Sequence, residues 1–411
     1  MAQAFGGAMR SYEALPPVTF AAPTLAAFLD ELRELRAAGS VANVKGAPPL
    51  VVRQAAVAGL MSDKRLRGMG MDYARTAGIP EGSRAWRWIE RQLLHMNGAD
   101  HYRLRRLVAR AFTANAIEAL RPYARSVIRG LIDAVFDAGR CDAVEKLTNP
   151  LPIPVICALL GVATDRAADM SRWTRAIGMV ERRDAGARLA EIEQALKELD
   201  DYLDAQIALR RAAPRDDLLS RLIAVEESGD RLSSDQLKAT LSGLLSAGTD
   251  TTRNQLASMI QSFIEHPDQW NLLRSRRDLV PNAVEEAIRW QPAVGAIALV
   301  PLEDIEIDGV VIPEGTVLLL STWSANHDES ALPGAARFDI TREASSTWRV
   351  SSFGGGVHYC IGASLARLEL TEALDELASR FDDLRADGKA VLNPAGSSFW
   401  GYRRLPIAWT T

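Results

Sequence analysis

The chain has 411 residues, of which 47% are hydrophobic and 24% are charged, and its formal net charge is −4. This composition is ordinary for a globular protein and excludes a wholly disordered chain. A mildly acidic chain has no bulk electrostatic reason to bind DNA or RNA, so we expect no nucleic-acid partner. The three cysteines, Cys141, Cys157 and Cys360, form no CxxC pair, which argues against a disulfide framework or a cysteine-rich zinc site.

The N-terminal 20 residues do not resemble a signal peptide, because they lack an apolar core and carry Glu13 and two prolines. The longest apolar run, 151–163, is shorter than the ~20 residues that a membrane-spanning helix needs, and prolines interrupt its start. We therefore expect no membrane segment, a cytoplasmic location and a flexible N-terminus over residues 1–20.

The hydrophobic pattern is mostly helical. In chain order, it predicts a helix over 23–38, a short strand entering a helix over 50–57, long amphipathic stretches over 101–137, an exposed charged helix over 185–212, a long helix over 233–265 and a short helix over 281–290. Ser233 and Gln236 make a capping box at the start of the long helix. Between 297 and 322 the period changes to alternation, with turns at Asp308-Gly309 and at 313–315, which predicts a small β region.

The C-terminal part begins with an irregular, glycine-rich stretch over 341–359. A helix is expected from about Ile361, and short strands over 390–410. The chain is therefore predicted to be mainly α with a small β region, and to form a single large domain over residues 1–411.

The segment FGGGVHYCIG, residues 353–362, is the most informative in the chain. Its three consecutive glycines allow a backbone to approach another group closely. Cys360 stands just before a predicted helix, whose first N–H groups stabilise an anion and lower a thiol pKa. A thiolate in this place suits a nucleophile or a metal ligand, and the alternative is a buried cysteine in a glycine turn.

This segment fills all six fixed positions of F-G-x-G-x-H-x-C-x-G, and here the chain resembles the cytochrome P450 family. The resemblance implies haem b, iron protoporphyrin IX, between the long helix and the cysteine-loop helix, with Cys360 as the axial thiolate. Such a thiolate donates electron density and favours O–O bond cleavage. The resemblance further implies that Phe353 packs beside the sulfur, that His358 reaches a haem propionate and that Gly362 lets the helix approach the haem.

The long helix contains AGTDTT, whose glycine and three threonines are poor helix formers. A threonine hydroxyl can bond back to the carbonyl four residues earlier and bend the axis, which opens a small polar groove. The segment completes the family motif [AG]-G-x-[DE]-T. The resemblance implies that Thr251 hydrogen-bonds dioxygen, that Asp250 belongs to a proton-delivery chain, and that Ala247 and Gly248 leave room for dioxygen. Thr252 is then structural.

Two further pairs match the family by spacing. Glu286 and Arg289 share one helix face, and the resemblance implies a buried structural triad completed by Arg337. His101 and Arg105, four residues apart, also share a face, and the resemblance implies that they bind haem propionates through charge-assisted hydrogen bonds. In both cases an exposed charged helix face is the alternative.

One position departs from the family. Related bacterial members commonly carry a propionate-binding arginine four residues before the strand that reads EDIEI here, and the matching residue is Leu299. We therefore expect this propionate contact to be absent. The remaining histidines, His95, His266 and His327, are expected at the surface or in loops, without chemistry.

Substrate contacts in this family come from variable segments, here 70–95 and 172–182 among others. The apolar side chains that we expect to contact substrate are those of Leu244, Val294, Ile297, Phe399 and Trp400. They indicate an apolar small-molecule substrate, although apolar stretches also form cores. Electrons are expected from a separate ferredoxin- or flavodoxin-type donor with its reductase.

A basic patch of Arg106, Arg110 and Arg349 is a candidate docking site for that donor, and a solvated face is the alternative. The resemblance implies a haem-thiolate monooxygenase that hydroxylates or epoxidises its substrate with dioxygen and two electrons. Oxidative coupling, desaturation, peroxide-driven oxidation and a non-catalytic haem sensor are the alternatives. The presence of both Asp250 and Thr251 favours dioxygen activation, because a sensor or a peroxide-driven enzyme has less need of them.

Overall fold

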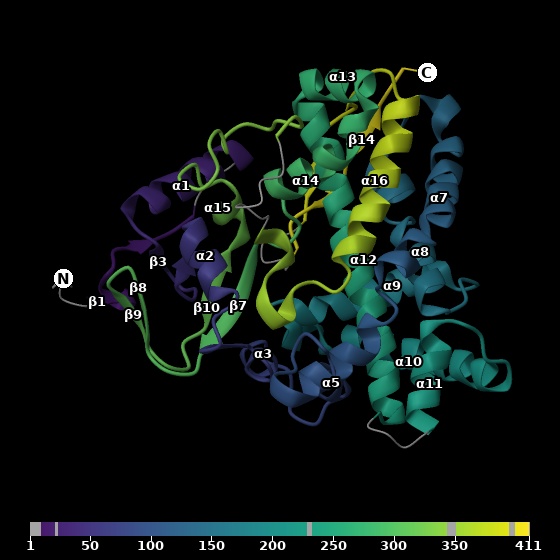
Figure 1. Ribbon diagram of the computed structural model, residues 1–411, viewed down its shortest axis with the longest axis horizontal. Coiled ribbons are helices and arrows are strands. Elements are labelled where there is room, and N and C mark those ends of the chain that lie inside the picture. Colours follow the sequence, from purple (N-terminus) through teal and green to yellow (C-terminus); the bar gives the residue numbers. More distant parts are fainter. Residues whose placement is uncertain (1–9, 21–23, 228–231, 343–350, 394–398, 411) are drawn as a thin grey trace. The chain divides into compact units, whose positions relative to one another are not determined.

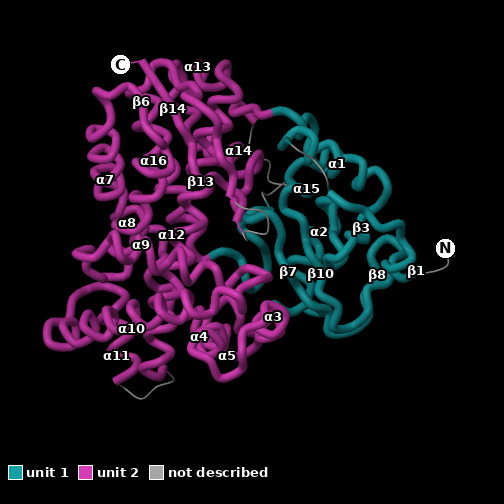
Figure 2. Tube along the Cα trace, turned by 180° about the vertical axis from the view of Figure 1, so that it is seen from behind, with its two compact units in different colours: residues 1–69, 294–337, 344–360 teal, residues 70–293, 338–343, 361–411 magenta. Residues whose placement is uncertain are grey.

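The computed structural model describes residues 10–20, 24–227, 232–342, 351–393 and 399–410. The chain divides into two compact units, which Figure 2 colours teal and magenta. Unit 1 comprises residues 1–69, 294–337 and 344–360, and unit 2 comprises 70–293, 338–343 and 361–411. The prediction of a mainly α chain with a small β region is confirmed, and the single domain stays a prediction.

Unit 1 holds a six-stranded mixed sheet in the order β2-β3-β4-β10-β7-β5 and a three-stranded sheet β1-β9-β8. Its elements are β1 (Arg10–Ser11), η1 (Tyr12–Ala14), β2 (Pro17–Val18), α1 (Leu25–Ala38), β3 (Val41–Val44), β4 (Leu50–Val51), α2 (Gln54–Leu60), β5 (Leu66–Gly68), β7 (Ala296–Pro301), β8 (Ile305–Ile307), β9 (Val310–Ile312), β10 (Leu318–Ser321), α15 (Thr322–Asn326), η7 (Ser351–Phe353) and η8 (Gly356–His358). β10 pairs with β4 in parallel and with β7 antiparallel.

The β region follows the alternation of the sequence. Asp308 and Gly309 turn the β8–β9 hairpin with φ of +49° and +79°, as the two central residues of a tight hairpin require. Ile305, Ile312 and Leu320 point into one apolar core between the strands and α2, and all three are at most 1% exposed. The period of two is thus set by one buried face of each strand.

Unit 2 is helical and is built around α12, which packs against α8, α9, α10, α14 and α16 (Figure 1). Its helices are α3 (Asp72–Thr76), α4 (Arg84–Glu90), α5 (Gly98–Ala109), α6 (Ala114–Glu118), α7 (Arg121–Asp133), η2 (Phe136–Ala138), the π-helix η3 (Val144–Thr148), α8 (Pro152–Leu160), α9 (Ala167–Ile177), η4 (Gly178–Glu181), η5 (Ala185–Arg188), α10 (Leu189–Ala212), α11 (Leu218–Glu227), α12 (Ser234–Glu265), α13 (Pro267–Ser275), η6 (Arg277–Leu279), α14 (Val280–Trp290) and α16 (Ala363–Arg380). Its strands are β6 (Arg140–Asp142), β11 (Arg385–Ala386), β12 (Val391–Leu392), β13 (Tyr402–Arg404) and β14 (Pro406–Ala408).

The long helix α12 begins one residue later than predicted and ends where the sequence indicated. Ser233 caps it by accepting a hydrogen bond from the Gln236 amide at 3.1 Å. The Gln236 side chain instead accepts a hydrogen bond from Arg103 on α5. The helix is continuous through AGTDTT.

One prediction about exposure needs correction. The helix expected to be exposed over 185–212 is α10, and it buries one face that includes Ile192, Leu196 and Leu199, because its apolar residues recur at helical spacing. Near the N-terminus, β1 pairs with β9 and β2 pairs with β3, and the flexible N-terminus expected over residues 1–20 stays a prediction. Residues 1–9 lie outside the described residues.

Candidate active site

The cysteine loop lies in unit 1 and ends at Cys360, three residues before α16 begins. Cys360 is exposed, and its amide donates a hydrogen bond to the Phe353 carbonyl at 2.9 Å. This bond closes the loop. The other two cysteines are different, because burial raises the pKa of both Cys141 and Cys157 to about 12. Cys360 is therefore the most accessible of the three cysteines, and its role as a metal ligand stays a prediction.

The three glycines of the loop are explained by its backbone angles and by its close packing. Gly354 and Gly356 have φ of +70° and +57°, which L side chains rarely adopt. A Cβ on Gly355 would lie 2.8 Å from the Met61 Cβ, and one on Gly356 would lie 2.7 Å from the Met61 carbonyl oxygen. The loop therefore sits directly on the end of α2, and side chains at these positions would displace it.

Strand β7 carries the predicted substrate residue Ile297 and the departure at Leu299. Both side chains are partly buried against the apolar core of the sheet. The Ile297 Cδ1 atom is also 3.3 Å from where a Cβ of Gly354 would stand, so Ile297 borders the cysteine loop. Leu299 thus packs against this core at the position where related bacterial members commonly carry an arginine. Val294 is half-buried, and its carbonyl accepts a hydrogen bond from the Thr322 hydroxyl.

In unit 2, α12 presents a stripe that is less buried than the rest of the helix. Leu244, Ala247, Gly248 and Thr251 follow the i, i+3, i+4, i+7 spacing of one helix face, and none of them is fully buried. The Thr251 hydroxyl donates to the Ala247 carbonyl at 2.8 Å, as the sequence predicted for a threonine in this segment. The residues around the stripe are core.

Gly248 has a packing reason beside the one implied by the family. A Cβ on Gly248 would lie 3.2 Å from two side-chain carbons of Ile156, so α8 packs closely against α12 at this point. The room for dioxygen that the resemblance implies at Ala247 and Gly248 stays a prediction. Thr252 is 3% exposed, consistent with its expected structural role.

Asp250 does not belong to the stripe and is only 5% exposed. Its Oδ1 atom is 3.0 Å from the Arg253 Nε, and Arg253 also donates a hydrogen bond to Asn149 Oδ1 at 3.1 Å. Burial raises the pKa of Asp250 above its ordinary value, while the positive charges of Arg253 and Arg175 partly oppose that shift. The carboxyl can therefore take up and release a proton closer to neutral pH than an ordinary aspartate can.

Helix α5 brings His101 and Arg105 onto one face, as the spacing predicted. His101 is 1% exposed, and burial together with the charge of Arg105 lowers its pKa, so the ring is neutral at neutral pH. A neutral ring donates one N–H, and the Arg105 guanidinium adds a positive charge, which is a suitable pair for a carboxylate. Arg106 is exposed on the same helix, Arg110 is exposed directly after its end, and Arg349 lies outside the described residues.

Glu286 and Arg289 form a fully buried bidentate ion pair, with both N–O distances 2.7 Å. Arg342 adds a third partner, with its Nε 3.3 Å from Glu286 Oε2. Sequence reasoning missed Arg342, which stands five residues after Arg337 in the same ARFDITR segment. Arg337 belongs to unit 1, and its place in the triad stays a prediction.

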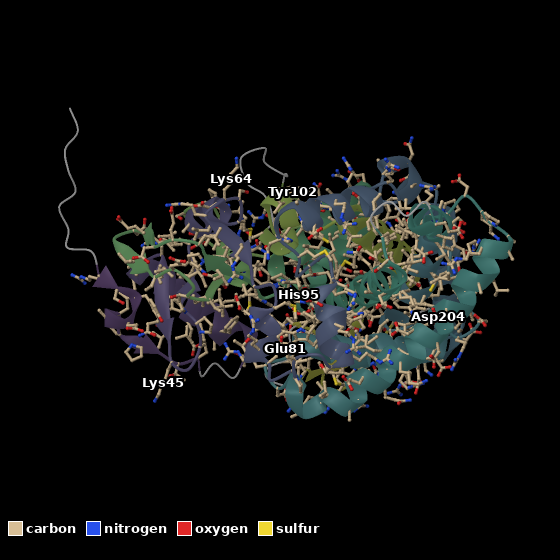
Figure 3. The ribbon with its side chains drawn as sticks, turned by 90° about the horizontal axis from the view of Figure 1, so that it is seen from below. Lys45, Lys64, Glu81, His95, Tyr102 and Asp204 are labelled. Atoms are coloured by element: carbon tan, nitrogen blue, oxygen red, sulfur yellow. The ribbon has the colours of Figure 1, made fainter. Side chains whose placement is uncertain are left out.

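Two histidines expected at the surface or in loops are buried. His95, labelled in Figure 3, is 8% exposed, and its Nε2 lies 3.3 Å from Glu181 Oε1. This contact joins the two variable segments 70–95 and 172–182. His327 is 3% exposed and bonds to the Trp323 carbonyl. Both lie in turns outside the helices and strands, within the expectation, but their burial was not foreseen because a single histidine carries no periodic signal of burial.

The C-terminal residues Phe399 and Trp400 are half-buried in unit 2. The Trp400 amide donates to the Ala293 carbonyl at 2.7 Å, and the Phe399 carbonyl accepts from Asn393 Nδ2 at 3.4 Å. The turn is therefore anchored to the segment that follows α14. Contact of either ring with a substrate stays a prediction.

A family model described as cytochrome P450 matches residues 182–395, just over half of the chain. Luteothin monooxygenase of Streptomyces thioluteus is 37% identical over 384 residues, which are 92% of this chain and 92% of that protein. The chain belongs to the cytochrome P450 family. This P450 is therefore an oxidoreductase of the monooxygenase type, and its cofactor is haem b.

Further comparisons agree with that assignment. Mycinamicin IV hydroxylase/epoxidase of Micromonospora griseorubida is 36% identical over 94% of this P450 and 96% of the relative. The crystal structure of CalO2 superposes with a TM-score of 0.87 at 28% identity, covering 93% of this P450 and 95% of that chain. The relatives are bacterial proteins of similar length.

The residues of this P450 suit the haem that the family binds. An exposed thiol ends the cysteine loop, its glycine backbone is held by Met61, and α12 has a face without large buried side chains. His101 and Arg105 offer donors for a propionate. Among the described residues, none of the helices combines the length and the apolar character needed to cross a membrane. The cytoplasmic location stays a prediction.

Proposed function

We propose that this P450 hydroxylates or epoxidises an apolar small molecule of the secondary-metabolite class, with two electrons from a separate ferredoxin- or flavodoxin-type donor and its reductase. Two relatives support the substrate class, since one is named for luteothin and the other for mycinamicin IV. The names hydroxylase and epoxidase on one relative support both outcomes at one site.

The observation that carries the proposal is the acid–alcohol pair on α12. Thr251 lies on the accessible stripe, and its neighbour Asp250 is buried with a raised pKa. When bound, haem b with a cysteinate ligand supplies the oxidising chemistry, because the thiolate favours O–O bond cleavage. The role proposed for Asp250 and Thr251 is to bring protons to that chemistry.

The proton demand follows from the balance of the reaction. In a hydroxylation, one atom of dioxygen enters a C–H bond of the substrate and the other leaves as water, which uses two electrons and two protons. Asp250 serves as the acid, because its raised pKa keeps the proton available nearer to neutral pH. The Thr251 hydroxyl donates its hydrogen bond to the Ala247 carbonyl, so its oxygen lone pairs are available to accept one.

The experiment that tests the class is the absorption spectrum of the reduced holoenzyme with carbon monoxide. We expect a strongly red-shifted Soret band in the wild type and its loss in Cys360→Ser, with loss of turnover. A Cys360→Ser variant with normal activity, or a wild-type band at the ordinary position, would overturn the thiolate assignment and favour the sensor alternative.

A second experiment tests Thr251. With a plant-type ferredoxin and its NADPH-dependent reductase as electron source, Thr251→Ala is expected to divert consumed dioxygen to hydrogen peroxide. Thr251→Ser, which keeps the hydroxyl, is the matched control and should stay close to wild type. An unchanged peroxide yield in Thr251→Ala would show that this alcohol has no part in proton delivery.

A further inference from the structure

Gly178 lies against the carboxylate of Asp250. It directly follows α9 and is the first residue of η4, and its φ and ψ of −60° and −18° are open to any L residue. Backbone conformation therefore does not require glycine there. The lack of space favours glycine, since a Cβ on Gly178 would stand 2.4 Å from Asp250 Oδ2.

The other side of the same carboxylate is held by charge. Asp250 Oδ1 contacts Arg253, which is tied in turn to Asn149. Arg175, three residues before Gly178 on α9, adds a second positive charge near the carboxylate. Asn149 lines an open depression of about 430 Å³ that is also lined by Asp142, Val144, Glu145, Val391, Arg403 and Arg404. Arg253 thus contacts one oxygen of the Asp250 carboxylate, and the other oxygen fills the space that a side chain at residue 178 would take.

We propose that Gly178 is a positioning residue for proton delivery, because its missing side chain keeps open the space that Asp250 Oδ2 occupies. The inference rests on the proposed role of Asp250. Gly178 acts only through that carboxylate. The junction of α9 and η4 would then have a role in oxygen activation.

The expected effect of a methyl group follows from the distances. Ordinary contact begins at about 3.4 Å, so Gly178→Ala requires a shift of about 1 Å from the 2.4 Å position. The carboxylate is the end of a side chain, whereas Gly178 is backbone at a helix junction, so the carboxylate moves. A misplacement of ~1 Å in a catalytic arrangement can cost as much as a hundred-fold in rate.

The test uses the haem-loaded enzyme with dioxygen as the only oxidant and the plant-type ferredoxin system as electron source. Gly178→Ala should lower NADPH oxidation by roughly ten-fold or more, raise the solvent deuterium isotope effect and change the pH profile. The carbon monoxide spectrum should stay unchanged. Gly130→Ala on α7, where nothing lies within 4 Å of the new Cβ, is the matched control and should behave as wild type.

Asp250→Ala separates the inference from the function on which it rests. In that background the space beside residue 178 is free, so Gly178→Ala should add no further loss. If Asp250→Ala alone keeps the wild-type rate and isotope effect, the proposed role of Asp250 fails. If Asp250→Ala is slow and Gly178→Ala is normal, the inference about Gly178 is overturned.

The proposal also remains testable if the Gly178→Ala variant fails to fold. If Gly178→Ala yields no haem-loaded protein, the double variant with Asp250→Ala should restore it, because the clash is with that carboxylate. A double variant that also fails to load would show that Gly178 serves the fold and not Asp250, which overturns the proposal.

Discussion

The cysteine loop of unit 1 and the Asp250 region of unit 2 both depend on glycine, but in different ways. In the loop, Gly354 and Gly356 are required by their own backbone angles, and the closing hydrogen bond joins Cys360 to Phe353, seven residues away. Around Asp250, the glycine is Gly178, which has an ordinary helical backbone. There the requirement comes from a side chain 72 positions further along the chain.

The difference teaches where each site can be damaged. The loop is built from one short stretch of chain, so substitutions at its glycines alter its backbone. The Asp250 region is assembled from α9, α12 and the segment at Asn149, so changes there should alter charge and position while leaving the helices formed.

The largest effect should come from the loop. Gly356→Ala places a Cβ 2.7 Å from the Met61 carbonyl oxygen at a φ of +57°, so most of the haem-loaded protein should be lost. The measurement is haem content per protein together with the carbon monoxide spectrum. Gly59→Ala on α2, where nothing lies within 4 Å of the new Cβ, should load normally. Normal loading of Gly356→Ala would remove the contrast between the two regions.

The next largest effect is a loss of stability of the helical unit 2. Glu286→Gln leaves the fully buried Arg289 without its counter-charge, and the free energy of unfolding should fall by about 3–5 kcal/mol. Urea unfolding of the holoenzyme measures it. The neighbouring Glu285→Gln affects a partly exposed pair with Arg367, and its cost should be within about 1 kcal/mol. Equal losses in the two variants would contradict the structural role of Glu286.

Asp250→Asn tests the role of charge in the Asp250 region, because it removes the titrating carboxyl group and keeps nearly the same side-chain shape. NADPH oxidation should slow by roughly ten- to hundred-fold. The pKa of Asp250 is raised above its ordinary value by burial, so its protonated fraction falls as pH rises through that pKa. The wild-type rate should decline along this limb, and the limb should be missing in Asp250→Asn. A variant that keeps the limb would place the titrating group elsewhere.

The smallest effect is expected at Glu369 on α16, which is 1% exposed. In the part of the chain that the structure describes, neither of its carboxylate oxygens has a hydrogen-bond partner. Burial raises the pKa of Glu369 well above its ordinary value, so ionisation costs stability as pH rises through the folded pKa. Glu369→Gln should therefore gain about 1 kcal/mol of stability relative to wild type, and more at high pH.

Glu372, one turn further along α16, is the matched contrast. It is equally buried, but Arg121 and Arg125 bind its carboxylate. Glu372→Gln should lower the free energy of unfolding at neutral pH. Denaturant unfolding at two pH values compares the variants, and the same sign for both would show that the arginines do not decide the outcome.

Much of the framework could be predicted from the sequence. The alternating period over 297–322, the caps of the long helix and the glycine loop before Cys360 are local signals, and each appears in the structure close to its predicted place. The motifs around Cys360 and Thr251 also led to the family that the comparisons confirm. The buried face of α10 follows from the helical spacing of its apolar residues and could have been predicted. The environment of His95 could not, because it depends on what packs against it.

The sequence by itself determined the elements and the identity of the chemical groups, since backbone period, turn residues and contiguous motifs are properties of neighbouring residues. Only the tertiary structure decided which distant residues meet: Arg342 on Glu286, Gly178 against Asp250, and Met61 beneath the glycine loop. The physical reason is that each of these contacts requires a missing side chain or a buried charge to match a partner far along the chain. No local pattern encodes that match, and packing alone selects it.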